Sequence, residues 1–472
     1  MSPSATPRPD ALVLTPPPTP ARDLRPWGAE ARTILRLSLP VMVAQVGLLG
    51  MGLVDTWLVG RLGDPAALAA VALGDACFFT LIVVALGLIQ ALDPLIAQAH
   101  GAGQVDRCAA AWRAGVRLAL ALTLPVSLAI WAAVPLLGRF ADLDAGVLAV
   151  TAGYLAARLP GVLPWLLYSS DRHLLHGLGS TVPTMVVTLV ANLVNGVLDY
   201  GLIFGAWGLP ALGVVGSGLA TAGCSWFMYL ALAAWMRRQA RYAQYRAPGP
   251  IPAGLLPLVV RIGLPLGLTH ALEVGAFAFA SVLVGKLGVV ALAGHQVAIK
   301  MASTSFMVAL ALGVGTSVRV GTLTGRGDPV GAARAGWTGL LLGAVAMGGA
   351  AALFLLFRVE IVGSFTTDPG VVAAGASLLM IAAAFQVFDG TQAVAGGALR
   401  GLGDTRFPML ANLGAYWVVA LPLGGVLAFS HGHGAEGVWW ALALGLLLAA
   451  VVLVWRFHAM QGARPIDQPS GA

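Results

Sequence analysis

Apolar residues in this chain form long runs, and polar residues gather in the short segments between them. Twelve runs are long enough to cross a bilayer as helices, since about 20 helical residues span about 30 Å of hydrocarbon. Several runs are longer, which predicts tilted or protruding helices. The predicted spans are residues 36–60, 66–98, 112–138, 146–169, 181–205, 211–236, 260–285, 290–318, 333–357, 370–398, 408–430 and 435–458.

The positions of Lys and Arg provide a separate test of these spans. If the N-terminus is cytoplasmic, the two tails and the even-numbered connections hold about 21 of the 27 Lys and Arg residues. The outer connections hold about four, at Arg61, Arg139, Lys286 and Arg358. This asymmetry is the positive-inside pattern, so we expect a multi-pass membrane protein with both termini in the cytoplasm.

Composition agrees with a protein that lies in lipid. Hydrophobic residues make up 58% of the chain and charged residues only 10%, whereas soluble domains carry about 25% charged residues. The net charge of +7 does not indicate a nucleic-acid partner, because no basic patch is interleaved with base-stacking aromatic residues. The three cysteines, Cys77, Cys108 and Cys224, match no zinc-site spacing.

The chain also contains an internal repeat. The segment that begins at Leu37 aligns without a gap with the segment that begins at Ile262, and LHGLGST from Leu175 aligns with LRGLGDT from Leu399. Each half holds six spans, an even number, so the halves run in the same direction about an axis along the membrane normal. We therefore predict an all-α protein of twelve helices in two pseudo-symmetric six-helix lobes with a central cleft, as in transporters.

The predicted organisation follows from these spans and from the polar segments. The N-terminal tail is Pro-rich and polar, lacks the apolar core of a signal peptide and is expected to be disordered. The segment between the halves is basic and then rich in Pro and Gly, as expected of a linker. The predicted parts are the N-terminal tail 1–34, the first lobe 35–236, the cytoplasmic linker 237–259, the second lobe 260–460 and the C-terminal tail 461–472.

Acidic residues inside the spans are candidates for function, because a charge at the bilayer centre costs at least about 2.5–3.5 kcal/mol. At 1.5 Å per residue, Asp55 and Asp199 fall at one depth in the outer half of the membrane. Asn195 precedes Asp199 by one helical turn and shares its face. We expect these three residues to form a polar cluster in the first lobe.

The second half carries a second pair of acids, Glu273 and Asp389, both near the midplane. Two carboxylates that approach in a medium of low dielectric cannot both stay ionised cheaply, so they share a proton or bind a cation. The alternative, in which each acid only hydrogen-bonds a neighbouring helix, stays open. Polar and aromatic residues expected to line the cavity are Gln45, Gln296, Phe306, Phe385, Gln386 and Gln392.

Enzymatic chemistry is not indicated. The spans contain no HExxH or GxSxG motif and no usable Cys/His set, and no strand precedes the Gly clusters. His173 and His176 are expected in a solvated cytoplasmic connection. We therefore expect neither catalytic residues nor a cofactor, and no metal beyond a coupling Na+.

Several motifs together resemble the multidrug and toxic compound extrusion (MATE) family, most closely its NorM branch, over about residues 33–460. They include LPVMVAQ from Leu39, GLVDTWLVGRLG from Gly52, GHQVAIK from Gly294 and FQVFDGTQAVAGGALRGLGDT from Phe385. The resemblance implies an inner-membrane bacterial antiporter, a monomer with a V-shaped cleft. It also implies export of cationic, amphipathic compounds in exchange for Na+ or H+ by alternating access.

The resemblance also implies roles for the membrane acids. Asp55 corresponds to the acid of the family's first helix, and Asn195 and Asp199 to a paired polar position on the fifth helix. Glu273 and Asp389 correspond to acids of the second-lobe cation site. A second interpretation keeps the fold and changes the cargo to a lipid-linked precursor, which a flippase would hold in a cationic cleft. The acidic candidates favour cationic cargo.

Overall fold

The structure, a computed structural model, describes residues 26–140, 144–461 and 466. Within these residues every element is helical, and twelve segments are long and apolar enough to cross a membrane, which confirms the predicted number of spans. The elements are α1 (Trp27–Gly60), α2 (Pro65–Gln90), α3 (Leu92–Gly101), α4 (Val105–Phe140), α5 (Ala145–Arg158), η1 (Leu159–Gly161), α6 (Val162–Gly177), α7 (Val182–Phe204), η2 (Ala206–Gly208), α8 (Val214–Arg238), η3 (Ala240–Arg246), α9 (Leu255–Gly285), α10 (Val289–Gly325), α11 (Pro329–Gly363), α12 (Pro369–Leu402), α13 (Arg406–Asn412), η4 (Leu413–Ala420), α14 (Leu421–Gly425), η5 (Val426–Ser430) and α15 (Gly434–Ala459).

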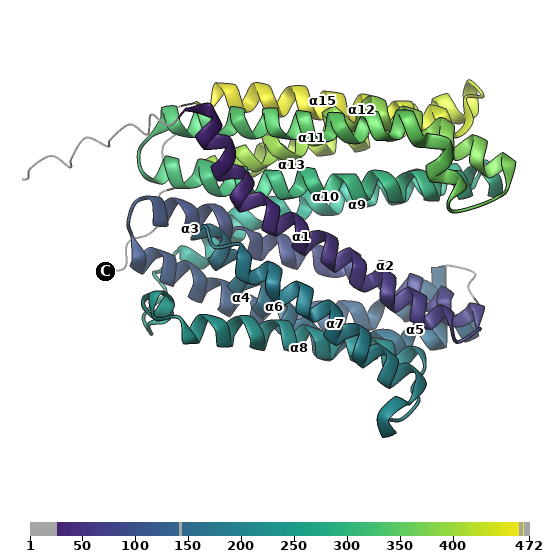
Figure 1. The fold of residues 1–472 in the computed structure, drawn as a ribbon, viewed down its shortest axis with the longest axis horizontal. Coiled ribbons are helices and arrows are strands. Elements are labelled where there is room, and N and C mark those ends of the chain that lie inside the picture. Colours follow the sequence, from purple (N-terminus) through teal and green to yellow (C-terminus); the bar gives the residue numbers. More distant parts are fainter. Residues whose placement is uncertain (1–25, 141–143, 462–465, 467–472) are drawn as a thin grey trace, which may run out of the picture.

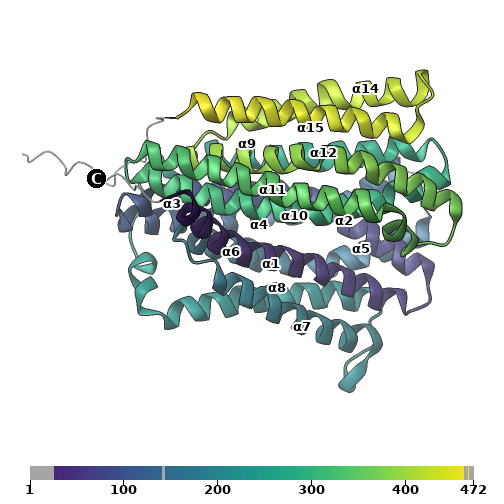
Figure 2. The same cartoon turned by 45° about the horizontal axis from the view of Figure 1, so that its top comes forward.

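The helices form two bundles that lie side by side, with α2 to α8 in the first lobe and α9 to α15 in the second (Figures 1 and 2). Helix α1 crosses obliquely between them and contacts α10 and α11 of the second lobe as well as α7 of the first. We call the end of the molecule where α1 begins and α15 ends the tail side, and the opposite end the far side.

Local sequence chemistry sets where several helices begin. In each of four cases an aspartate side chain accepts a hydrogen bond from a backbone N–H of the first turn, which satisfies a donor that the helix itself cannot. In three of the four, the next residue is a proline, whose fixed φ suits the first helical position. The four capping residues are Asp64, Asp144, Asp328 and Asp368.

Four spans are interrupted, which hydrophobic runs alone do not reveal; one of them is the ninth, where the backbone at Phe357 within α11 is non-helical. The second span breaks at Ala91 into α2 and α3, because Pro94 lacks the N–H that would donate to the carbonyl oxygen of Gln90. The fourth span breaks at η1, Leu159–Gly161. The eleventh contains the wider π-helical segments η4 and η5. Such π segments often occur at functional sites.

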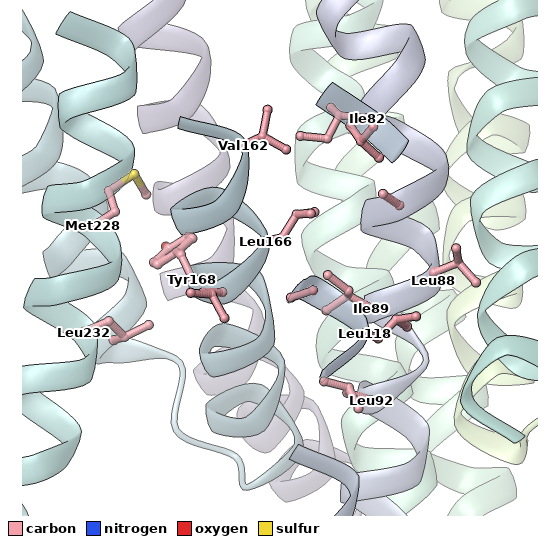
Figure 3. Packing of buried hydrophobic residues seen from close by; sticks show 14 of the residues in the cluster. Ile82, Leu88, Ile89, Leu92, Leu118, Val162, Leu166, Tyr168, Met228 and Leu232 are labelled. Atoms are coloured by element: carbon pink, nitrogen blue, oxygen red, sulfur yellow. The ribbon is translucent and has the colours of Figure 1, made fainter. Parts of the chain in front are cut away.

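A continuous apolar core holds the first lobe together. Side chains from α2, α3, α4, α6 and α8 interdigitate in it, among them Ile89, Leu92, Leu118, Leu166 and Met228 (Figure 3). Truncating one such residue to Ala costs about 2–5 kcal/mol, because the packed neighbours do not fully close the cavity. The core therefore gives the lobe a rigid frame for its polar residues.

The two lobes meet at backbone distance on the tail side. A Cβ atom placed on Gly101 of α3 would lie 2.0 Å from the carbonyl oxygen of Thr322 on α10. A Cβ atom on Gly325 of α10 would lie 2.0 Å from the carbonyl oxygen of Gln98. Glycine is required here because any side chain would separate the helices. The lobes are therefore closed against each other on the tail side.

The structure corrects two predicted boundaries. Helix α1 begins at Trp27, so residues 27–34 are helical and do not belong to the tail predicted for 1–34. The reason is that Glu30 lies buried and forms an ion pair with Arg319 of α10. Residues 1–25 lie outside the described residues.

The predicted linker 237–259 is also shorter than expected, because α8 extends to Arg238 and α9 begins at Leu255. Between them, η3 packs on the first lobe, where the Tyr242 hydroxyl donates to the Ser180 hydroxyl over 2.9 Å. Of the predicted C-terminal tail, Ile466 is described beyond Gln461, and its N–H donates to the side chain of Gln98.

Candidate functional site

A cavity of about 510 Å³ lies between the two lobes. Its walls come from α1, α2, α6 and α7 on one side and from α9, α10, α12 and η4 on the other. Small-molecule sites typically measure about 300–1,000 Å³ and combine apolar walls with a few placed polar groups. Size and position suit a small organic ligand held between the lobes.

On the second-lobe wall, Glu273 is the centre of a hydrogen-bond network. Its Oε1 accepts from Gln392 Nε2 over 2.8 Å and from Asn412 Nδ2 over 2.7 Å. The Tyr416 hydroxyl in turn donates to Gln392 Oε1 over 3.0 Å, which directs the amide nitrogen toward the carboxylate. Two uncharged donors thus hold one carboxylate oxygen, and no cationic partner neutralises it within hydrogen-bond distance among the described residues.

Asp389 lines the same wall and is buried, yet it makes no hydrogen bond within the described part of the chain. A buried carboxylate without a donor is costly unless it takes up a proton or a cation. Asp389 and Glu273 therefore provide two acids on one wall, one held by amides and one without a partner.

His270 links the two lobes across the cavity. Its Nε2 donates to the side-chain oxygen of Gln90 on α2 over 2.9 Å, and its Nδ1 lies 3.9 Å from Glu273 Oε2. Since Gln90 Oε1 is an acceptor, Nε2 carries the hydrogen of this bond, and Nδ1 faces the carboxylate of Glu273. The imidazole thus lies between a first-lobe amide and a second-lobe acid.

The first-lobe acids form a separate, enclosed cluster. Asn195 Nδ2 donates to Asp55 Oδ1 over 2.5 Å and to Asp199 Oδ2 over 2.6 Å, so one amide bridges two carboxylates. The hydroxyl of Thr221 on α8 donates to the other oxygen of Asp55 over 3.3 Å. The structure thus brings together Asp55, Asn195 and Asp199 from α1 and α7, as the depth estimate predicted.

This cluster also contains oxygen atoms without partners. Asp199 Oδ1, Asn195 Oδ1 and Ser217 Oγ are all buried and make no hydrogen bond within the described residues. None of these residues lines the 510 Å³ cavity. Unpartnered oxygen atoms beside two carboxylates are the ligands that a hard cation prefers, or the site of a shared proton.

His173 and His176 lie at the tail-side end of the cavity, not in the solvated connection that the sequence predicts. Both histidines are buried and line the cavity, because α6 continues past the predicted end of the span at residue 169 as far as Gly177. His173 Nδ1 donates to Asp93 Oδ1 over 2.8 Å, and Arg172 lines the cavity beside it. The first-lobe wall is therefore basic and the second-lobe wall acidic, whereas the sequence favoured an acidic cleft.

Of the residues predicted to line the cavity, four do so: Gln45, Phe306, Phe385 and Gln392. Two predictions are wrong. Gln296 is exposed, because the preceding residue, His295, is the one that points inward. Gln386 is buried between helices and donates to the hydroxyl of Ser305 on α10 over 2.6 Å.

Sequence reasoning missed several members of the site, although helical spacing would have found some. His270 precedes Glu273 by three residues and shares its face. Asn412 and Tyr416 stand four residues apart in an apolar span, a spacing that also places them on one face. Their approach to Glu273 required the tertiary structure, because they come from a different helix.

Comparison with known sequences gives a consistent result. The sequence model of the MatE family matches residues 40–201 and 265–426, so both bounds of the second match lie 225 residues after those of the first. This offset is the one at which Leu37 aligns with Ile262, which confirms the internal repeat.

Two curated bacterial proteins are similar over almost their whole length. The multidrug resistance protein NorM of Burkholderia vietnamiensis is 38% identical over 434 residues, which cover 90% of this chain and 92% of that protein. The probable multidrug resistance protein NorM of Pseudomonas putida is 38% identical over 442 residues, with 91% and 94% covered.

Solved structures share the fold. The crystal structure of the eukaryotic MATE transporter AtDTX14 superposes with a TM-score of 0.83 at 22% identity, covering 91% of this chain and 96% of that chain. An outward-facing multidrug resistance MATE family transporter of the MOP superfamily gives 0.82 at 21% identity, covering 92% and 97%. At such low identity these matches show the architecture alone.

Proposed function

Because this chain belongs to the MATE family, whose members are transporters and not enzymes, we propose that it exports cationic, amphipathic compounds in exchange for Na+ or H+. The carrying observation is the cavity between the lobes, with aromatic side chains and two acids on its second-lobe wall. Phe277, Phe306 and Phe385 offer apolar and π surfaces to an organic cation, and Glu273 and Asp389 offer negative charge.

The coupling step is proposed to use the enclosed acids of the first lobe. A proton or Na+ at Asp55 and Asp199 would offset their mutual repulsion and would use the unpartnered oxygen of Asn195. The cluster joins α1 to α7 and α8, so a change in its charge changes the packing of α1. Because α1 also contacts α10 and α11, that change reaches the second lobe.

Glu273 and Asp389 are proposed as a second coupling position that the exported cation shares. A cation in the cavity and a proton on these acids exclude each other through charge, which is the requirement for exchange. Gln392 and Asn412 keep the Glu273 oxygen directed by hydrogen bonds, so its position does not depend on the cargo.

Alternating access is proposed as rocking of one lobe on the other. In this structure the lobes are closed on the tail side at Gly101 and Gly325, so the cavity would be reached from the far side. We place the tail side in the cytoplasm of a bacterial inner membrane, on the basis of the Lys and Arg asymmetry. In that orientation, with the protein acting as a monomer, this conformation would release cargo outward.

Transport in vesicles tests this proposal. Purified protein is reconstituted into vesicles, and uptake or release of a fluorescent organic cation is recorded with a Na+ gradient and a pH gradient imposed separately. We expect one gradient to drive transport and the Asp55→Asn and Asp389→Asn variants to lose that response while remaining folded. The matched control is Asp64→Asn, since Asp64 is an exposed helix cap outside both sites.

Three outcomes would contradict the proposal. Export that ignores both gradients would remove the antiport mechanism. Gradient-driven export at the unaltered rate in both acid variants would remove the assigned coupling sites. Movement of a lipid-linked precursor without movement of organic cations would favour the flippase interpretation.

A further inference from the structure

A second hollow, separate from the central cavity, lies between α4 of the first lobe and α9 and α13 of the second. Its volume is about 900 Å³, and it shares no lining residue with the central cavity. We call it the α4–α9 groove. Its walls are mainly apolar, formed by Leu118, Ala121, Leu256, Pro257, Val260, Leu264, Pro265, Leu268, Met409 and Leu410.

Three arginines from three different helices complete this lining: Arg117 of α4, Arg261 of α9 and Arg406 of α13. All three are exposed. None of them forms an ion pair or a hydrogen bond with another described residue. Exposed arginines without acidic partners, at the edge of an apolar groove near the membrane surface, attract anionic headgroups.

Part of the apolar wall of the groove lies deeper than Arg261 and Arg406. Arg406 is the first residue of α13, on the tail side, and Arg261 lies in the second turn of α9. Leu264 and Leu268 follow Arg261 along α9 at about 5 and 10 Å toward the middle of the helix. Arg261 and Arg406 therefore lie near the tail-side ends of their helices, Arg117 lies deeper in α4, and the part of the apolar wall formed by Leu264 and Leu268 extends toward the hydrocarbon.

We propose that the α4–α9 groove binds an anionic phospholipid. Its phosphate lies among Arg117, Arg261 and Arg406, whose guanidinium groups match phosphate oxygens in geometry and charge. Its acyl chains follow Leu264 and Leu268 into the bilayer. A soluble phosphate would occupy only the charged part of the groove and would leave the apolar wall without a specific partner. A zwitterionic headgroup carries a positive charge beside its phosphate, and the three arginines would repel that charge. Basic pockets between membrane helices are known to favour anionic headgroups.

The position of the groove means that the lipid contacts both lobes at once. Arg117 belongs to the first lobe, and Arg261 and Arg406 to the second. Helix α9 separates the two hollows, with Leu264 and Leu268 on the groove and His270 and Glu273 on the central cavity. The lipid therefore lies one helix away from the candidate transport site without entering it.

Lipid binding to the purified full-length protein tests the proposal independently of transport. The protein in detergent is titrated with phosphatidylglycerol or with phosphatidylcholine of the same acyl chains, and bound lipid is counted by native mass spectrometry. We expect retention of phosphatidylglycerol over phosphatidylcholine. The triple variant Arg117→Gln, Arg261→Gln, Arg406→Gln should weaken phosphatidylglycerol binding by about 100-fold, and each single variant by about fivefold.

Controls separate this site from general charge effects and from misfolding. Arg238→Gln removes an exposed arginine at the end of α8, outside the groove, and should leave binding unchanged. The triple Arg→Lys variant keeps the charge and should retain most of the preference. The proposal would be overturned if the triple Gln variant bound phosphatidylglycerol as tightly as the unaltered protein. It would also be overturned if any folded single variant did so, or if glycerol phosphate bound as tightly as the lipid.

Discussion

Arg319 on α10 binds Glu30 on α1 through two hydrogen bonds, from Nε to Oε1 over 2.5 Å and from Nη2 to Oε2 over 2.9 Å. Both residues are buried, and the pair joins the crossing helix to the second lobe on the tail side. Asp55, near the far end of the same helix, is held by Asn195 of α7. One carboxylate of α1 therefore binds each lobe, and the two carboxylate residues lie about 38 Å apart along the helix.

Replacing Glu30 with Gln should destabilise the closed tail side. The amide keeps the shape of the side chain but removes the negative charge that the buried guanidinium of Arg319 faces. Removing one partner of a buried pair typically costs about 3–5 kcal/mol. We expect a lower thermal unfolding temperature in detergent and, between spin labels on the two lobes at the tail side, a longer mean distance.

A second ion pair provides the control for Glu30→Gln. Arg456 Nε lies 2.8 Å from Asp404 Oδ2, but both residues belong to the second lobe and the arginine is about one-third exposed. Such a pair contributes about 0–1 kcal/mol. Asp404→Asn should therefore change the unfolding temperature little and leave the distance between the lobes unchanged. An equal change in distance in both variants would contradict the anchoring role of Glu30.

The Gly101→Ala substitution should prevent closure of the lobes on the tail side. The added methyl would lie 2.0 Å from the Thr322 carbonyl oxygen, which is backbone and cannot rotate away. Because α3 and α10 belong to different lobes, separating the lobes relieves the contact without unfolding either one. We expect increased labelling by a membrane-impermeant reagent of a cysteine placed at Gln98, measured from the tail side.

Gly348→Ala is the matched control for this substitution. Gly348 lies in α11, and nothing lies within 4 Å of the position that its Cβ would occupy. Alanine in a helix interior is more favourable than glycine by about 0.5–1 kcal/mol, so the unfolding temperature should rise slightly. Labelling at Gln98 should stay unchanged. The same labelling in the Gly101 and Gly348 variants would show that the close approach does not control access.

The architecture could be predicted from the sequence because lipid makes the hydrophobic pattern unambiguous. Each of the twelve predicted spans corresponds to one membrane-length segment of the structure, and the repeat predicted two similar halves. The proximity of Asp55, Asn195 and Asp199 followed from helical rise alone, since depth along a straight helix is a function of residue number.

Contacts that depend on rotation about a helix axis, or on a neighbouring helix, could not be predicted in this way. Depth does not show which way a side chain points, so the sequence predicts Gln296 at the cavity although its side chain is exposed. The sequence predicts a tail at Glu30 because its partner, Arg319, is 289 positions away. The crossing of α1 between the lobes has no signature in hydropathy, because both lobes present apolar faces.

Asn195→Ala should impair gradient-driven transport more severely than Asn192→Ala, which removes a neighbouring amide. Asn195 provides the one donor that bridges Asp55 and Asp199, so without it two buried carboxylates face each other directly. The site should then hold a proton or Na+ irrespective of the gradient. We expect gradient-driven export in vesicles to fall at least about tenfold, the loss expected from 1.4 kcal/mol.

Asn192→Ala is the control for this variant, since Asn192 lies one turn earlier on α7 and its amide donates to the Thr188 carbonyl oxygen of its own helix. Export by Asn192→Ala should stay within about twofold of the unaltered protein. A similar loss in both variants would indicate that any change in this turn of α7 impairs transport. The bridging role of Asn195 would then be rejected.

Tyr416→Phe should affect cation coupling indirectly, through the side-chain amide of Gln392. The Tyr416 hydroxyl donates to Gln392 Oε1, and this contact keeps Gln392 Nε2 directed at Glu273. Without the hydroxyl, the amide is free to rotate and present its oxygen to the carboxylate, which repels it. Loss of one such hydrogen bond costs about 0.5–1.5 kcal/mol, so the concentration of coupling cation giving half-maximal export should shift about two- to tenfold.

The comparison variant is Tyr168→Phe, which removes a hydroxyl from the opposite wall of the same cavity. Tyr168 contacts the hydroxyl of Thr188 over 3.2 Å and touches neither carboxylate of the second lobe by a hydrogen bond. Its loss should alter apparent affinity for the organic cation and leave the dependence on coupling cation unchanged. If Tyr168→Phe shifts that dependence as much as Tyr416→Phe does, the second-lobe network does not set it, and coupling has to be sought in the first-lobe cluster alone.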